Sequence, residues 1–321
     1  MTTILIFGSD EERHARHVYE ALQAMGETPY YWDTRKAETG ELSFAFDPQN
    51  PQAGYLMPTP GLVLPLSHVK SVYWRTHYGV HLQPAVVNDL QAGHLAYLKE
   101  REWTCGLESL YRSMAEHCLW VNDWQAIAMH QHKPYQLQCL AQNGLRVPRT
   151  LITNSAHALG HFAQQAPQQS LIFKPVLGGG HTAPLNAEAL APERLEDLPF
   201  CPVTFQEQLE GVDVRVYGLQ DELFAAEIHA NSLDFREDEN ARLVPIELPP
   251  SVQADCRKVM ELLGLVWTAI DLRYNPTTGE YVFIEANPSP MFIHFERQTG
   301  FPLTQRLCEW LAKGLTGAMA S

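Results

Sequence analysis

The sequence predicts an α/β protein of two or three domains, in which a small β-α-β region precedes two α+β subdomains. The chain has 321 residues, of which 45% are hydrophobic and 19% charged, so it is too long for one small hydrophobic core. Its first third alternates short apolar runs with helical periodicity, a pattern typical of a doubly wound parallel sheet. Its last third carries strand patterns of period two that are separated by turn residues.

The first domain is expected to span residues 1–120 and to open with a β-α-β unit. Residues 2–8 (TTILIFG) are a short apolar run that predicts a buried parallel strand. The stretch 11–25 spaces its apolar side chains at helical intervals, and Gly26 follows as a helix stop. Residues 28–33 (TPYYWD) then resume the strand pattern and complete the unit.

The rest of the first domain is expected to hold one more strand and a long helix. Residues 47–68 are rich in proline and glycine, so they predict loop or edge structure. Residues 71–79 predict a strand that carries Arg75, and residues 88–119 predict the helix.

Two further domains are expected at residues 121–204 and 205–321. A helix is predicted from Pro134 to Gln142, because proline suits the first turn and Asn143-Gly144 follows the last. Strands are predicted at TLIT (150–153), LIFKP (171–175), VTFQEQL (203–209), VDVRVYGL (212–219), LFAAEIHA (223–230) and YVFIEANP (281–288).

Charge and cysteine usage exclude several classes of protein. The net charge of −14, from 37 acidic and 23 basic residues, predicts neither a nucleic acid nor a membrane partner. The six cysteines are scattered without a C-x-x-C pair, which argues against a zinc ribbon or a disulfide framework and fits a reducing cytoplasm. The chain starts acidic after one strand, unlike a signal peptide. The close histidine pairs, His14/His17 and His130/His132, are expected to be surface or satisfied histidines rather than metal ligands.

A lysine followed by three glycines forms the first candidate motif. In LIFKPVLGGG, Lys174 lies at the end of an apolar strand pattern, and Gly178, Gly179 and Gly180 follow it. Glycines permit positive φ and let backbone N–H groups approach an anion closely. The motif is neither a P-loop nor G-x-G-x-x-G, and a mobile linker is an equally valid interpretation.

A hairpin near the C-terminus forms the second motif. The turn residues NPTTG separate two strand patterns, and if Asn275 pairs with Tyr281, Asp271 falls directly opposite Glu285. Glu285 and Asn287 share one face because strand side chains alternate. Three oxygen donors of this kind suit Mg²⁺, which keeps several waters and shares phosphate oxygens. The alternative is the polar edge of an antiparallel sheet.

The third motif is FQEQLEGVDVRVYG (205–218). Glu207 lies at a strand end, and Asp213 and Arg215 alternate onto one face of the next strand. Arginine suits a bidentate grip on phosphate or carboxylate oxygens. A ladder of salt bridges is the alternative interpretation.

The order of these motifs resembles the ATP-grasp superfamily over about residues 120–315. The supporting segments are KPYQLQCLAQNGLRVPRTLIT, FKPVLGGG, FQEQLEGVDVRVYG and IEANPSP with the following TGFPL. Within the superfamily the chain is most similar to the RimK-like ligases, and among these to the graspetide ligases that macrocyclise microviridin-type peptides. The resemblance implies a small pre-ATP-grasp domain at 1–120, followed by two α+β subdomains at 121–204 and 205–321 that grip ATP between them.

The resemblance also implies roles for individual residues. Arg215 would act near the transferred phosphate, and Arg273 would hold the acyl phosphate or a substrate carboxylate, unless it forms only a structural salt bridge. The implied metal ligands are Asp271, Glu285 and Asn287. The implied nucleotide-binding residues are Lys133, Lys174, the flap Gly178, Gly179 and Gly180, the adenine hinge Gln206, Glu207 and Leu209, and Glu210 or Asp213 for the ribose.

The implied function is an ATP-dependent carboxylate–amine or carboxylate–hydroxyl ligase that works through an acyl phosphate on a peptide or protein. Its implied cofactors are ATP and Mg²⁺, or Mn²⁺ in place of Mg²⁺, and Arg75 and His294 are candidates for substrate contacts. A ligase of free amino acids and an ATP-binding regulatory protein without turnover are the alternatives. Homodimers and homotetramers are common among the proteins it resembles.

Overall fold

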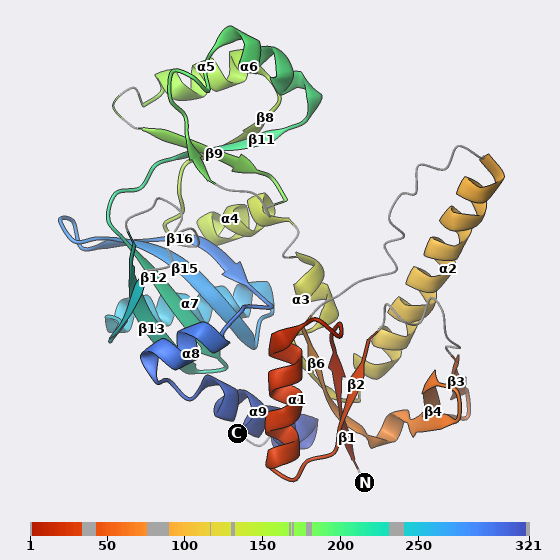
Figure 1. Ribbon diagram of the computed structural model, residues 1–321. Coiled ribbons are helices and arrows are strands. Elements are labelled where there is room, and N and C mark those ends of the chain that lie inside the picture. The colour runs from red at the N-terminus through yellow and green to blue at the C-terminus, as the bar shows by residue number, and fades with distance from the viewer. Residues whose placement is uncertain are drawn as a thin grey trace. The chain divides into compact units, whose positions relative to one another are not determined.

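The computed structural model describes residues 2–33, 43–75, 90–115, 117–129, 132–166, 168, 170–177, 182–230 and 241–318 (Figure 1). The chain divides into two compact units, of which the first comprises Met1–Trp124, Met291–Glu296 and Pro302–Ser321. The second comprises Gln125–Pro290 and Arg297–Phe301. The C-terminal helix therefore belongs to the first unit, whereas the sequence placed it in the last of three consecutive domains. Among the described helices, none combines the length and the apolar character that crossing a membrane requires.

The first unit is built on a parallel sheet with strand order β2-β1-β6-β7. Its strands are β1 (Thr3–Phe7), β2 (Pro29–Trp32), β6 (Val69–Trp74) and β7 (Leu119–Val121). The long helices of this unit are α1 (Arg13–Ala24), α2 (Leu90–Ala115) and α9 (Leu303–Ala318). The predicted β-α-β opening and long helix are confirmed. The strand predicted at 71–79 corresponds to β6, which ends at Trp74, and residues 76–79 lie outside the described part of the chain.

Helix α9 completes this unit because it packs on the sheet near β6 and beside α1 (Figure 1). Its buried side includes Leu307 and Leu311. The fully buried Ser71 of β6 donates its hydroxyl to the Leu311 carbonyl at 2.8 Å, and Lys70 Nζ donates to the Ala312 carbonyl at 3.0 Å. An apolar helix face far along the sequence thus supplies part of the core of the N-terminal unit.

The proline-rich stretch of the first unit is a separate three-stranded antiparallel sheet, so the prediction of loop or edge structure there was incomplete. Its strands are β3 (Ser43–Asp47), β4 (Asn50–Thr59) and β5 (Leu62–Pro65), followed by a 3₁₀ turn at Leu66–His68. The β4–β5 pairing is irregular between Leu56 and Thr59, and Pro58 lies in that irregularity. Proline lacks a backbone N–H, and an irregular register tolerates it where a regular ladder would not.

The histidine pair of α1 is satisfied by protein contacts, as predicted. His14 Nδ1 accepts a hydrogen bond from the backbone N–H of Phe292 at 3.3 Å, and His17 Nε2 lies 2.9 Å from the Thr304 hydroxyl. Burial, aided by the charge of Arg75, lowers the pKa of His14 to about 4. The imidazole is therefore neutral near pH 7 and serves as an acceptor. The second predicted pair falls partly outside the described residues.

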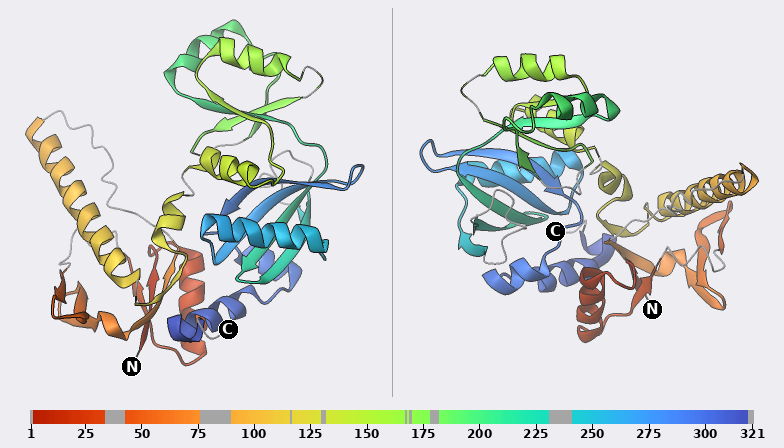
Figure 2. Two further views of the ribbon diagram at one scale, coloured as in Figure 1. Left: turned by 180° about the vertical axis from the view of Figure 1, so that it is seen from behind. Right: turned by 45° about the horizontal axis from the view of Figure 1, so that its top comes forward.

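The described residues of the second unit form two antiparallel sheets. The smaller has strand order β10-β9-β11-β8, with helices beside it that share its small core (Figure 2). Its strands are β8 (Thr150–Thr153), β9 (Leu171–Pro175), β10 (Ala183–Pro184) and β11 (Val203–Glu207). Its helical elements are α5 (Ala156–Gln164), α6 (Pro192–Asp197) and the 3₁₀ turn Leu198–Phe200.

The larger sheet has strand order β14-β13-β12-β15-β16, and helix α7 (Pro250–Leu263) covers one face (Figures 1 and 2). Its strands are β12 (Val212–Leu219), β13 (Glu222–His229), β14 (Arg242–Ile246), β15 (Trp267–Asn275) and β16 (Glu280–Asn287). Helices α3 (Trp124–Met129) and α4 (Lys133–Gln142) precede these sheets in the chain, and α8 (Ile293–Thr299) is divided between the two units at Glu296. The predicted helix at 134–142, the predicted strands at 212–219 and 223–230 and the predicted hairpin are confirmed, whereas β14 was not predicted.

A β-bulge corrects the predicted hairpin register. Asn275 pairs with Glu280 rather than with Tyr281, yet Asp271 still lies opposite Glu285. The two facts are compatible because Ile284 is an extra residue where the register shifts. The bulge also shifts the alternation of side chains between the two faces of the sheet. As a result, Phe283 and Ala286 both enter the core beside α7. Without it, Glu285 would point into that core.

The link between β11 and β12 requires glycine. Gly211 has φ +120°, and a Cβ there would lie 2.0 Å from the Tyr274 carbonyl oxygen. We expect Gly211→Ala to lower the free energy of unfolding by about 3 kcal/mol or more, because backbone must move. Gly279→Ala is the matched control, since Gly279 has φ +73° but open space around it, and about 1 kcal/mol is expected. Urea denaturation of both variants measures the difference, and equal losses would contradict the close approach at Gly211.

Candidate functional site

Strand alternation gathers charged side chains on the face of the larger sheet that is opposite α7. Val214, Val216, Ile270 and Leu272 point into the core beside α7, so their neighbours in the sequence point the other way. Arg215 lies opposite Asp271, and Asp271 lies opposite Glu285 on the next strand. We call this surface the polar face, and its members are Asp213, Arg215, Asp271, Arg273, Glu285 and Asn287.

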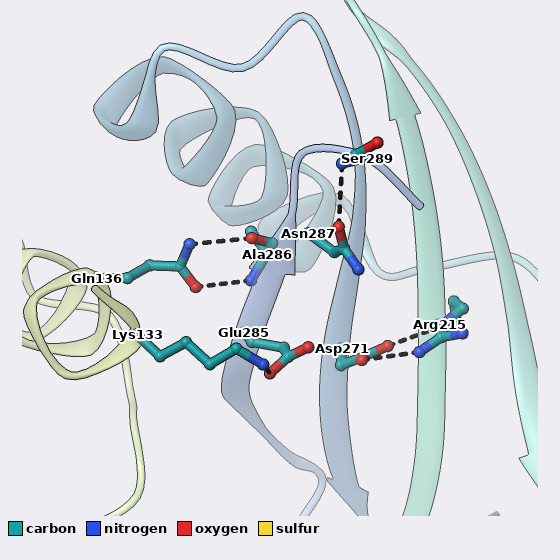
Figure 3. A network of polar contacts seen from close by, with 8 residues as sticks. All are labelled: Lys133, Gln136, Arg215, Asp271, Glu285, Ala286, Asn287 and Ser289. Atoms are coloured by element: carbon teal, nitrogen blue, oxygen red, sulfur yellow. Dashed lines mark hydrogen bonds and ion pairs between the residues drawn. The ribbon is translucent and has the colours of Figure 1, made fainter. Parts of the chain in front are cut away.

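The carboxylates in the centre of the polar face are held by cations (Figure 3). Arg215 grips Asp271 with two hydrogen bonds, Nε to Oδ1 at 2.8 Å and Nη2 to Oδ2 at 2.8 Å. Lys133, the first residue of α4, places Nζ 2.8 Å from Glu285 Oε2. These side chains are 19–23% exposed, so a ligand can still reach them.

Arg273 joins the polar face to the adenine hinge predicted from the sequence. Its Nη1 lies 2.7 Å from Asp213 Oδ1, and its Nε donates to the Leu209 carbonyl at 3.1 Å. Burial raises the pKa of Asp213, although Arg273 opposes this effect. The contacts match the salt bridge that was the alternative interpretation of Arg273. Glu210, which follows Leu209 in the sequence, is exposed.

The hinge side chains are buried and bonded to protein. Gln206 donates its amide to the Thr150 hydroxyl at 2.8 Å. Glu207, 4% exposed, accepts from the Arg149 backbone N–H at 3.0 Å and from Arg146 Nη2 at 3.1 Å. These contacts brace the strand end, and the adenine-binding role of both residues stays a prediction.

Sequence reasoning missed Gln136, which contacts β16 between two predicted metal ligands. Its Nε2 donates to the Ala286 carbonyl at 2.9 Å, and its Oε1 accepts from the Ala286 N–H at 2.8 Å (Figure 3). The signal in the sequence was a glutamine on the same side of the helix as the apolar Leu137 and Leu140. The structure shows that all three are buried. A buried polar side chain needs hydrogen-bond partners, so its presence predicts a specific contact.

Comparison with known proteins identifies the family. No family model matches the sequence. The solved structure of the ATP-grasp ligase PsnB, complexed with a minimal precursor, superposes with a TM-score of 0.81 and 31% sequence identity. The similarity covers 97% of this chain and 98% of PsnB. The chain belongs to the ATP-grasp ligases.

Other relatives agree with this assignment. The macrocyclase MdnC of Microcystis aeruginosa MRC, bound with precursor peptide MdnA, has a TM-score of 0.79 and 26% identity. That similarity covers 97% of this chain and 99% of MdnC. The alpha-aminoadipate–LysW ligase LysX of Sulfurisphaera tokodaii is 24% identical over 209 residues, which are 60% of this chain and 73% of LysX.

The donor set of this ATP-grasp ligase fits magnesium. Asp271 and Glu285 lie on paired positions of adjacent strands, and Asn287 lies two residues further along. Two carboxylates and an amide are hard oxygen donors, too few to fill a six-coordinate shell without water and phosphate oxygens. Within the described part of the chain, no group of three His, Cys, Asp or Glu side chains forms a complete metal site. The residues therefore suit an ion that arrives with a nucleotide.

The positions of the other predicted site residues do not by themselves indicate a function. Lys174 is in β9, paired in register with Thr204, and the glycine flap after it falls outside the described residues. Arg75 of the first unit is 8% exposed and places Nε 3.4 Å from Glu12 Oε1. His294 is exposed on α8. Their roles stay predictions.

The segment after the predicted metal ligands is anchored by its own contacts. The backbone N–H of Ser289 donates to Asn287 Oδ1 at 3.0 Å. Glu296 accepts from the Thr304 backbone N–H at 2.7 Å and from the Thr304 hydroxyl, so it caps the start of α9. Glu296 therefore has a structural role.

Proposed function

We propose that this ATP-grasp ligase activates a carboxylate of a peptide with ATP and joins it to an amine or hydroxyl, giving an amide or an ester. The observation that carries the proposal is the polar face, where two carboxylates and an amide lie beside Lys133 and Arg215. Such a surface can hold both the metal ion and the charged oxygens of a triphosphate. The peptide substrate is supported by PsnB and MdnC, whose structures were solved with a precursor or precursor peptide.

The proposed reaction has two steps. A carboxylate oxygen attacks the γ-phosphorus, the bond from that phosphorus to the β–γ bridging oxygen breaks, and ADP leaves. The amine or hydroxyl then attacks the acyl carbonyl, phosphate leaves with the original carboxylate oxygen, and a proton is released. Both steps move negative charge without covalent participation of the protein, so positioned cations can accelerate them.

The side chains of the polar face would divide this work. Lys133 and Arg215 would turn from Glu285 and Asp271 to phosphate oxygens as the nucleotide binds, and Lys174 would contact the same group. Asp271, Glu285 and Asn287 would hold Mg²⁺. When bound, this ion would neutralise part of the negative charge of the phosphates. Mn²⁺ takes the same oxygen donors and is proposed as a substitute.

The adenosine would bind at the hinge. Leu209 offers its backbone, while the buried Gln206 and Glu207 keep the strand end in place. Of the two ribose candidates, we favour Glu210, because it is exposed whereas Asp213 is held by Arg273. The glycine flap at 178–180 would exclude water from the acyl phosphate.

Release of ADP separates this proposal from its alternatives. The purified protein is incubated with ATP and Mg²⁺, together with either synthetic peptides rich in Thr, Ser, Lys, Asp and Glu or a mixture of free amino acids. We expect ADP to rise only with peptide. ADP released with free amino acids alone would support a small-molecule ligase, and nucleotide binding without turnover would support a regulatory ATP-binding protein. Heavy oxygen placed in the peptide carboxylate should appear in the released phosphate.

A further inference from the structure

We infer that Gln136 is a positioning residue for the metal site, through its grip on the backbone of Ala286. Ala286 lies between Glu285 and Asn287, two of the three proposed magnesium ligands. The inference rests on the metal assignment in the proposed function, and it adds a residue that the sequence motifs did not single out.

The contact is closed and bidentate. Gln136 is 2% exposed, and its amide donates to the Ala286 carbonyl at 2.9 Å and accepts from the Ala286 N–H at 2.8 Å. Among the described strands, β16 is the last of its sheet, so the outward backbone groups of Ala286 face no neighbouring strand there. The Gln136 amide therefore replaces one residue of such a strand (Figure 3).

Fixing Ala286 fixes the direction of its neighbours. Side chains on either side of a strand residue point to the same face, so rotation of the Ala286 peptide groups would turn Glu285 and Asn287 together. The bulge at Ile284 makes this support necessary, since it interrupts the β15–β16 pairing just before Glu285. Thr268 holds the far end of the strand by donating its hydroxyl to the Asn287 carbonyl at 2.9 Å.

Helix α4 thus makes two different contacts with the same strand. Lys133, one turn before Gln136, contacts Glu285 by an ion pair that a metal ion and a phosphate can replace. The Gln136 contact is neutral and buried, so neither ligand can replace it. When Lys133 turns toward a nucleotide, Gln136 keeps the backbone of the metal-ligand strand in place.

Manganese binding tests this role apart from catalysis. In the full-length protein with a non-hydrolysable ATP analogue, Mn²⁺ is titrated and followed by electron paramagnetic resonance. Gln136→Met removes both hydrogen bonds, and Gln136→Asn withdraws the amide by one methylene. We expect each to weaken Mn²⁺ binding by about 10–100-fold and to alter the spectrum of the bound ion. Binding of the analogue without metal should change less than about twofold, because Lys133 and Arg215 are intact.

Gln138→Met is the matched control, since Gln138 is an exposed glutamine of the same helix. Wild-type affinity and spectrum in a folded Gln136→Met or Gln136→Asn variant would overturn the positioning role. Equal losses of metal and nucleotide affinity would also overturn it, because they indicate general loosening. Failure of the wild type to bind Mn²⁺ with the analogue, or unchanged binding in Glu285→Gln, would instead refute the metal site of the proposed function.

Discussion

Replacing Glu285 with Gln is expected to lower kcat of the ligase reaction by about 10²–10³-fold while leaving the fold intact. Glu285 is the proposed metal ligand that also pairs with Lys133 at 2.8 Å in this structure. The amide keeps the size of the side chain but loses the charge that attracts a divalent ion. Excess Mg²⁺ should restore part of the activity if the loss arises from metal affinity. The measurement is ADP release as a function of Mg²⁺ concentration, with circular dichroism as a check on folding.

Glu280→Gln provides the control for that substitution. Glu280 is on the same strand, is 50% exposed and pairs at the surface with Arg146. Exposed ion pairs contribute little to stability, so this variant should keep its activity within about twofold. Full activity of Glu285→Gln would refute the metal assignment.

Arg215→Lys is expected to lower kcat by about 10²-fold or more. Arg215 presents two donors in one plane, as its two 2.8 Å bonds to Asp271 show, and the single ammonium of lysine cannot reproduce that geometry. The charge of the site is unchanged, so nucleotide binding should weaken much less than turnover. Single-turnover kinetics and nucleotide titration measure the two effects separately.

The matching control for this prediction is Arg242→Lys, an exposed arginine on the edge strand β14 of the same sheet. It should turn over at the wild-type rate. If Arg215→Lys is as active as Arg242→Lys, Arg215 serves only as a partner of Asp271 and takes no part in phosphoryl transfer.

Much of the site could be predicted from the sequence because strand alternation is local. The period of two places Asp213 with Arg215, and Glu285 with Asn287, on the polar face without knowledge of the fold. The pairing of Asp271 with Glu285 was predicted from an incorrect register, which the bulge at Ile284 compensates. A bulge depends on how the strand packs against α7, and no turn residue signals it.

Long-range packing explains the contacts that could not be predicted from the sequence. Gln136 acts through a strand 150 residues away, and its partners are backbone groups that carry no sequence signature. Likewise, α9 joins the N-terminal unit through an apolar face. The sequence shows that this face is apolar but not which sheet it covers. Turn and helix signals locate such elements, whereas tertiary contacts decide their neighbours.

The most direct test of the polar face is to locate a bound metal ion. Crystals of the protein with Mn²⁺ and a non-hydrolysable ATP analogue are measured at a wavelength where manganese scatters anomalously. We expect an anomalous peak within coordination distance of oxygens from Glu285 and Asn287, with the Lys133 ammonium turned toward phosphate. A manganese peak elsewhere, with the Lys133–Glu285 ion pair intact beside bound nucleotide, would contradict it.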